Sequence, residues 1–275
     1  MVLMIIDGKK IATEIIDKLK QLEKPKKFLA AFLIGENSAS ESFIKQKEKT
    51  AAALGVDFRT YKFLNDISQD KLRKEALKIV LGGKCGGAIV QLPLPAHINS
   101  QYVLNAIPRE KDVDVLGDRA LGAFYAGRNP ALPPAVGAFE EISRAANYPL
   151  NTSRVAVVGL GNLVGKPIAV WCAGKVRELY LLDKGSDFAV LKQTDIAVCG
   201  AGVPGLIKPE MLKETALVVD FGYGLKNGKF SGDFDSESLK IKNYKLKINF
   251  TPTPGGTGPI LVAKLFENFF TLAKE

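Results

Sequence analysis

The chain has few of the residues that build metal centres. It holds three cysteines and a single histidine, His97, in 275 residues. The cysteines, Cys85, Cys172 and Cys199, lie far apart in apolar segments without CxxC spacing. This pattern argues against a zinc site and against acid–base catalysis by histidine. We expect no bound metal.

Long apolar runs are also lacking. The opening residues MVLMII are too short for a signal-peptide core and have no basic flank, and no later run approaches about 18 apolar residues. With 47% hydrophobic and 24% charged residues, the composition is typical of a soluble globular protein of two ordinary domains. We therefore expect a cytoplasmic protein without a membrane segment.

Negative charge is in deficit, since the formal net charge is +9. The lysines are scattered, however, and no aromatic-basic motif of an RNA or DNA module occurs, so we expect no nucleic-acid partner. An acidic small substrate together with a phosphorylated cofactor would explain the charge. A solvated surface without special function would explain it equally well.

Helix-period and strand-like segments alternate along the chain. We expect helices at 11–22, from Ser40, and at 68–81, 136–146 and 260–274, and strands at 28–34, 56–63, 87–91, 155–158, 178–182, 195–200, 216–221 and 245–250. This alternation indicates the α/β fold class, with a parallel sheet in each half. A stretch rich in glycine, alanine and proline, 117–134, is predicted to be the linker between them.

A glycine turn joins strand and helix in the segment RVAVVGLGNLVGKP, residues 154–167. Gly159 permits backbone angles closed to other residues, Gly161 lets a phosphate approach the main chain, and Gly165 completes a GxGxxxG spacing. Asp183 closes the next strand, where an acidic residue commonly binds a ribose. These features predict a dinucleotide site, although glycines required only for packing would give the same pattern.

The helix from Ser40 carries a lysine within its apolar face. Ser38 and Glu41 form a capping-box signature, and Gly55 is a plausible C-terminal stop. At about 100° per residue, Lys47 falls near the centre of an arc formed by Phe43, Ile44, Ala51 and Leu54. Desolvation would lower its pKa toward the range of a working base. The alternative is that Lys47 extends along its stem to solvent.

Two further segments contain candidate site residues. Gln91 ends the strand GAIVQ, at the carboxyl end where parallel sheets bind ligands. Asp112 and Asp114 alternate with valines in KDVDVL and are expected to face one way. Paired aspartates suit acid–base or metal chemistry, whereas aspartates that merely form a turn are equally common.

Six motifs occur in an order that resembles the bifunctional methylenetetrahydrofolate dehydrogenase/cyclohydrolase family. They are IIDGKKIA, QLPLP, KDVD, the glycine turn with NLVGKP, GDFD and TPTPGGTGP. The resemblance covers nearly the whole chain. It implies oxidation of 5,10-methylenetetrahydrofolate by NAD(P), followed by hydrolysis of the methenyl product to 10-formyltetrahydrofolate.

The resemblance also implies an architecture. A catalytic folate-binding domain, 1–117 completed by 257–275, would face a Rossmann-like doubly wound NAD(P)-binding domain, 118–256, across a cleft. The family further implies a homodimer formed largely through the cofactor domain.

Site residues follow from the resemblance motif by motif. The family's Tyr-x-x-x-Lys motif falls on Phe43 to Lys47, with Lys47 held by Gln91, and Asp114 matches the pterin-binding aspartate. The remaining implied binding residues are Pro254, Gly255 and Gly256 for the folate and Gly159, Leu160, Gly161, Gly165, Asp183, Lys184 and Tyr223 for the cofactor.

The sequence departs from the family at several positions. Phe43 keeps a ring for stacking but lacks the phenolic hydroxyl, so a dehydrogenase with weak cyclohydrolase remains an alternative, as does a non-catalytic dinucleotide-binding sensor. Pro133 to Val136 replace the usual PCTP. Leu160 stands where the family's glycine turn has an arginine. The loss of that cation and the presence of Asp183 favour NAD, whereas Lys184 and the positive net charge favour NADP. We expect NADP as the working cofactor, with NAD accepted.

Overall fold

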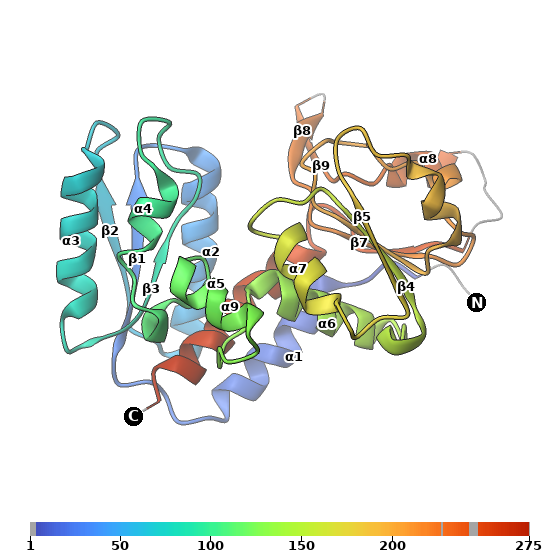
Figure 1. Cartoon of the computed structure of the whole chain (residues 1–275). Coiled ribbons are helices and arrows are strands. Elements are labelled where there is room, and N and C mark those ends of the chain that lie inside the picture. The colour runs from blue at the N-terminus through green and yellow to red at the C-terminus, as the bar shows by residue number, and fades with distance from the viewer. Residues whose placement is uncertain (1–3, 227, 242–246, 275) are drawn as a thin grey trace. The chain divides into compact units, whose positions relative to one another are not determined.

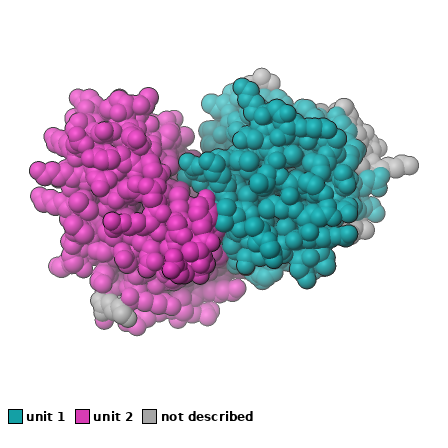
Figure 2. All heavy atoms as spheres, viewed as in Figure 1, with its two compact units in different colours: residues 1–13, 135–261 teal, residues 14–134, 262–275 magenta. Residues whose placement is uncertain are grey.

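The computed structural model describes residues 4–226, 228–241 and 247–274, and the chain divides into two compact units (Figure 1, Figure 2). Unit 1 contains residues 1–13 and 135–261, and unit 2 contains residues 14–134 and 262–275. The division into functional domains expected from the sequence, with residues 1–117 and 257–275 in one domain and 118–256 in the other, remains a prediction. Within the described ranges, no helix is long and apolar enough to cross a membrane.

Unit 2 is built on three parallel strands in the order β2-β1-β3. Its elements are β1 (Phe28–Ile34), α2 (Ser38–Leu54), β2 (Phe58–Phe63), α3 (Gln69–Leu81), β3 (Cys85–Val90), α4 (Ser100–Leu104), the 3₁₀ turn η1 (Arg109–Lys111) and α5 (Asp118–Tyr125). The central strand β1 reads FLAAFLI and is buried at all seven positions. Its continuous apolar run therefore reflects cover on both faces of the sheet, as expected for a central parallel strand.

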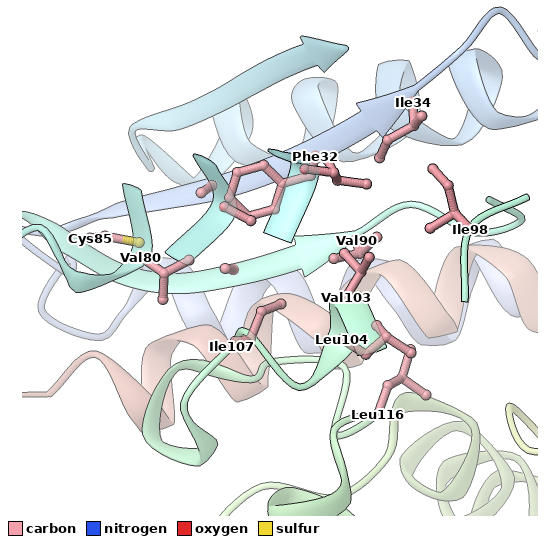
Figure 3. Packing of buried hydrophobic residues seen from close by; sticks show 14 of the residues in the cluster. Phe32, Ile34, Val80, Cys85, Val90, Ile98, Val103, Leu104, Ile107 and Leu116 are labelled. Carbon is pink, nitrogen blue, oxygen red and sulfur yellow. The ribbon is translucent and has the colours of Figure 1, made fainter. Parts of the chain in front are cut away.

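The two faces of this sheet are packed by different helices. On one face Phe32 and Ile34 of β1 pack with Val80 of α3 and with Val103 and Leu104 of α4 (Figure 3). The other face is covered in part by the C-terminal helix α9 (Thr257–Leu272), whose Phe266 ring lies 6.4 Å from that of Phe58 in β2. The C-terminal helix is thus part of the core of unit 2 from residue 262 onward.

Unit 1 contains a five-stranded parallel sheet in the order β10-β7-β6-β4-β5. Its strands are β4 (Arg154–Val158), β5 (Glu178–Leu182), β6 (Ile196–Cys199), β7 (Leu217–Asp220) and β10 (Asn249–Phe250). After β5 the chain returns to the opposite side of β4, so the strand order reverses at β4. The carboxyl end of β4 is therefore the switch point at which doubly wound sheets bind ligands.

Helices and a hairpin complete unit 1. They are α1 (Gly8–Lys20, which continues into unit 2), α6 (Pro134–Ala145), α7 (Gly165–Cys172), α8 (Ser236–Ile241), the 3₁₀ turns η2 (Leu150–Thr152), η3 (Phe188–Gln193) and η4 (Pro209–Met211), and the hairpin β8 (Gly224–Lys226) and β9 (Lys229–Ser231). The predicted α/β class with two parallel sheets is confirmed.

Three local predictions need correction. The predicted linker 117–134 contains a helix, α5, which buries Ala120, Ala123 and Phe124. These residues form an apolar helix face, which the high glycine and proline content of the surrounding stretch makes hard to recognise in the sequence. The cap of α2 is Asn37, whose side chain accepts from the Ser40 N–H at 3.0 Å, so the predicted Ser38 cap is wrong. The predicted strand 245–250 lies partly outside the described residues, and β10 covers only its last two positions.

Candidate active site

Lys47 lies on the buried face of α2. The helix ends at Gly55, which adopts a left-handed φ of 66° and donates to the carbonyls of Ala51 and Ala52, as predicted. Ile44, Ala51 and Leu54 are buried on the face that faces the sheet, and Lys47 is half-buried among them. The helical phase read from the sequence therefore placed this lysine correctly.

The Lys47 ammonium is bonded inside unit 2 instead of extending to solvent. Its Nζ donates to Oε1 of Gln91 at 2.9 Å. Gln91 is buried at the carboxyl end of β3, its backbone N–H donates to the carbonyl of Phe32, and its Nε2 donates to the carbonyl of Leu92 at 2.8 Å. Because the amide nitrogen is engaged by Leu92, the carbonyl oxygen of the side chain is the group presented to Lys47.

Lys47 and Asp114 influence each other electrostatically. Burial lowers the pKa of Lys47, and the Asp114 carboxylate partly opposes that shift. Burial likewise raises the pKa of Asp114, and the Lys47 ammonium opposes it. The two groups therefore sit in a region of low dielectric in which each helps the other to stay charged. The pKa values of Lys47 and Asp114 are therefore closer together than those of the same groups in water.

Asp112 and Asp114 do not act as an equivalent pair. Asp112 is 2% exposed, and its Oδ2 accepts from the N–H groups of Leu116 and Gly117 at 3.0 and 2.8 Å. Burial, with a smaller contribution from Asp114, raises the pKa of Asp112 to about 7. Asp112 thus holds the turn together, as the turn-forming alternative proposed, and Asp114 is the member that interacts with Lys47.

Two other residues of α2 share the face of Lys47. Phe43 is half-buried and lies one turn before Lys47. Ser40 lies two turns before Lys47 and is 2% exposed, and its Oγ has no hydrogen-bond partner among the described residues. Ser40 was not predicted, although its spacing of seven residues from Lys47 could have identified it.

The glycines of the β4–α7 turn have different structural roles. A Cβ on Gly159, where φ is 85°, would lie 2.6 Å from the backbone of Ala201, and one on Gly165 would lie 1.9 Å from the carbonyl oxygen of Gly159. These two glycines are therefore required by packing. Among the described residues, a Cβ on Gly161 would meet nothing within 4 Å, and no side chain caps the N-terminus of α7. The turn thus fits the close approach of a dinucleotide phosphate at Gly161.

Asp183 and Lys184 come directly after β5, the strand that pairs with β4. Both side chains are exposed, and Asp183 Oδ1 accepts from the N–H of Lys184 at 2.9 Å, while the Asp183 N–H donates to Ser186 Oγ. Leu160 is half-buried in the glycine turn. A carboxylate and an ammonium are thus both available at the carboxyl edge of the sheet, where the ribose of a dinucleotide is usually bound.

Buried aspartates support the loop after β7. Asp220 accepts from the N–H groups of Gly222, Asp233 and Phe234. Burial raises the pKa of Asp220 to about 7. Tyr223 follows this loop, is 43% exposed, and stacks on Phe230 with ring centroids 4.5 Å apart. The GDFD motif contains Asp233, whereas no sequence pattern indicates Asp220.

The PGG segment lies between β10 and α9 in unit 1. Gly255 adopts a φ of 97°, which other residues rarely tolerate, and a Cβ there would meet no described atom within 4 Å. Gly256 is packed, since a Cβ on it would lie 2.5 Å from the carbonyl oxygen of Pro252. Pro254 is exposed. The segment thus presents bare backbone at Gly255.

The predicted residues form two groups. Phe43, Lys47, Gln91 and Asp114 all belong to unit 2, and the residues predicted for the cofactor and the PGG segment all belong to unit 1. A doubly wound sheet with a glycine turn at its switch point, and a second α/β unit with a desolvated lysine, define the class as a two-unit NAD(P)-dependent enzyme.

Family comparisons specify that class further. Residues 6–114 match the model of the tetrahydrofolate dehydrogenase/cyclohydrolase catalytic domain, and residues 133–275 match that of its NAD(P)-binding domain. The chain belongs to the tetrahydrofolate dehydrogenase/cyclohydrolase family. It oxidises 5,10-methylenetetrahydrofolate with a nicotinamide cofactor and hydrolyses the methenyl product to 10-formyltetrahydrofolate.

Relatives are similar over nearly their full lengths. The bifunctional protein FolD of Exiguobacterium sibiricum is 32% identical over 98% of this chain and 99% of its own, and that of Halothermothrix orenii is 35% identical over 96% and 95%. The crystal structure of the Campylobacter jejuni FolD superposes with a TM-score of 0.89 at 29% identity, covering 97% of each chain. The Trypanosoma brucei enzyme, solved with NADP and an inhibitor, gives 0.88 at 26% identity over 98% and 96%.

Proposed function

We propose that Lys47, oriented by Gln91, carries the proton transfers of the cyclohydrolase step. The observation that supports this role is the 2.9 Å bond from Nζ to Gln91 Oε1 at a lysine whose pKa burial lowers. In hydrolysis, water adds to the methenyl carbon and loses a proton, and the bond from that carbon to N5 breaks as N5 gains a proton. Neutral Lys47 takes the proton lost by the added water, and its ammonium form supplies the proton that N5 gains. The hydroxyl of the carbinol intermediate loses its own proton to solvent as the formyl C=O forms, so hydrolysis releases one proton overall.

Asp114 is proposed to bind the pterin. A carboxylate accepts hydrogen bonds from ring N–H groups and thereby fixes the orientation of the carbon that loses hydride. The nearby Lys47 ammonium favours the ionised form of Asp114 that such acceptance requires. Phe43, one helical turn from Lys47, would stack on the aminobenzoyl ring, and Pro254, Gly255 and Gly256 would present backbone to the folate.

The absence of a phenolic hydroxyl at position 43 favours a second candidate, a dehydrogenase with a weakened hydrolytic step. Purified protein incubated with methylenetetrahydrofolate and each cofactor distinguishes the cases by methenyl absorbance. Formation of 10-formyltetrahydrofolate without lasting methenyl absorbance supports the bifunctional assignment. Methenyl accumulation at the spontaneous hydrolysis rate supports the second candidate, and no cofactor reduction contradicts both.

NADP is the proposed working cofactor. The nicotinamide accepts the hydride when the cofactor is bound, and the chain's own contribution is to hold its phosphates at Gly161 and its ribose near Asp183 and Lys184. Exposed Lys184 can offset the aspartate beside a 2′-phosphate, since one charge-assisted contact contributes roughly 1.5 to 3 kcal/mol. The NADP complex of the Trypanosoma brucei relative supports this choice.

The ratio of kcat/KM for NADP over NAD tests that choice. The parent should favour NADP slightly, and Lys184→Ala should lower the ratio by about tenfold. A parent that prefers NAD by more than about tenfold, or a ratio unchanged in the variant, contradicts the proposal.

A homodimer formed through the edge strand β5 is proposed as the assembly. In the part of the chain that the structure describes, no strand pairs with the outer side of β5, and Leu181 on it is 50% exposed. Val170 of α7 and Leu163 before it are 39% and 50% exposed. Unpaired strand edges with apolar side chains pair readily with a second copy about a two-fold axis.

The cytoplasmic location stays a prediction, which cell fractionation would test.

Sedimentation at micromolar concentration tests the dimer. The parent should sediment at twice the chain mass, and Leu181→Lys should sediment as a single chain while keeping its fold. A parent that sediments only as a single chain would rule out the assembly.

A further inference from the structure

Asn268 of the C-terminal helix α9 connects two distant segments of unit 2. It is 5% exposed, and its Nδ2 donates to the carbonyl of Val113 at 2.8 Å and to that of Leu132 at 2.7 Å. An amide nitrogen carries two hydrogens, so these bonds use its full donor capacity. Val113 immediately precedes Asp114 in the chain, which places the contact one residue from the proposed pterin ligand.

The segment that carries Asp114 is fixed from its other sides by strand β3 and its own turn. Asp112 forms a parallel bridge with Ala88 of β3, and the side chain of Val113 is fully buried. A Cβ added to Gly87 of β3 would lie 2.8 Å from Val113 and equally close to Phe269 of α9. Val113 is therefore packed between β3 and α9, with its carbonyl bonded to Asn268.

We infer that Asn268 is a positioning residue for Asp114: it holds the Val113 carbonyl so that the Asp114 carboxylate stays in its binding orientation before the folate arrives. The inference rests on the proposed role of Asp114 and extends it to a residue more than 150 positions away in the sequence. Pre-organised binding groups avoid the entropy cost of ordering on association, which gives the contact a functional consequence.

The chemistry of the position restricts what can replace the amide. Serine or threonine has one donor and would leave one buried carbonyl unpaired, and an aspartate would place a carboxylate against two carbonyl oxygens. Leucine has nearly the same shape as asparagine and no donor. Asn268→Leu thus removes both bonds without opening a cavity, which makes it the sharpest test of the hydrogen bonds themselves.

Asn129 offers a matched control. Its Nδ2 donates to the carbonyl of Ala131 at 2.9 Å, next to Leu132, and within the described part of the chain its side chain forms no hydrogen bond with the Val113 segment. Asn129→Leu therefore loosens the same loop, 126–134, without releasing Val113. The two variants are compared in the full-length protein by thermal unfolding and by KM for methylenetetrahydrofolate and NADP, well below the unfolding temperature.

Asn268→Leu should raise KM for the folate by about tenfold and leave KM for NADP within about twofold. Asn129→Leu should leave both constants at the parent values. If Asn268→Leu fails to fold, Asn268→Ser, which keeps one donor, carries the same comparison with a smaller rise. A parent-like folate KM in a folded, destabilised variant overturns the inference, as does an equal rise for both substrates.

A double-mutant cycle with Asp114→Asn separates this inference from the function on which it rests. In the Asp114→Asn background, Asn268→Leu should add less than about twofold to the folate KM, because the group that it positions is already changed. An undiminished, independent effect overturns the inference. A parent-like folate KM in Asp114→Asn alone contradicts the proposed role of Asp114 itself.

Discussion

Replacing Lys47 by methionine tests the proposed base directly. The substitution removes the 2.9 Å bond to Gln91, which costs roughly 1 kcal/mol, and it also removes a desolvated ammonium from an apolar helix face. Methionine and lysine have similar helix propensities. These effects oppose each other, but Gln91 Oε1 is left without its donor and Asp114 without the nearby ammonium, so the free energy of unfolding should fall by about 1 to 3 kcal/mol, which leaves a typical domain folded.

The cyclohydrolase rate of Lys47→Met should fall strongly although the protein stays folded. Loss of a general acid–base group typically costs about 10² to 10⁴ in rate. Hydride transfer needs no proton from Lys47, so the dehydrogenase should continue and methenyltetrahydrofolate should accumulate. The KM for the folate should rise in this variant, because Asp114 loses the ammonium that favours its ionised form. In the parent, hydrolysis should increase with pH through the pKa of Lys47, which burial places below its ordinary value, because the base must be neutral.

The assay follows methenyl absorbance and NADPH formation together, with 10-formyltetrahydrofolate measured at the end. Lys45→Met is the matched control, since Lys45 is exposed on the same helix and should retain parent rates for both steps. Parent-like hydrolysis by a folded Lys47→Met variant would refute the reasoning. An equal loss in Lys45→Met would mean that the positive charge of the helix, and not the buried base, supports hydrolysis.

Further predictions concern the aromatic ring, the glycine turn and a buried carboxylate. Phe43→Tyr should leave the cyclohydrolase rate similar or higher, and a large loss measured in the methenyl assay would mean that the pocket is packed around the phenyl ring. Gly165→Ala should destabilise unit 1 by more than about 3 kcal/mol, because its Cβ would lie 1.9 Å from the Gly159 carbonyl oxygen. Gly161→Ala, where the Cβ meets nothing, should keep stability and raise KM for NADP by about tenfold, and parent-like KM would argue against phosphate contact there. Burial raises the pKa of Asp220 from 3.8 to about 7, so its contribution to stability is complete below about pH 4 and is lost as pH increases to 7 and beyond, by about 2 to 4 kcal/mol. Thermal unfolding from pH 5 to pH 8 should therefore show a flatter pH dependence in Asp220→Asn, and parallel curves would contradict the shift.

Local patterns in the sequence determined several features by themselves. The run Phe28–Ile34 predicts a strand buried on both faces, and the structure buries all of it. The phase of α2 placed Lys47 on the buried face because 3.6-residue periodicity depends only on near neighbours. The glycine turn predicts the strand–turn–helix junction between β4 and α7 for the same reason, since the backbone angles at Gly159 are a local requirement.

Only the tertiary structure determines which role each of several distant residues has. Asp112 and Asp114 look equivalent in the sequence, yet one holds backbone amides and the other interacts with Lys47. The Lys47–Gln91 bond spans 44 positions, and the Asn268–Val113 bond spans 155. The type of a side chain limits which groups it can form a hydrogen bond with. Packing of the sheet and helices determines which of these groups come into contact, and the neighbouring residues in the sequence do not specify this.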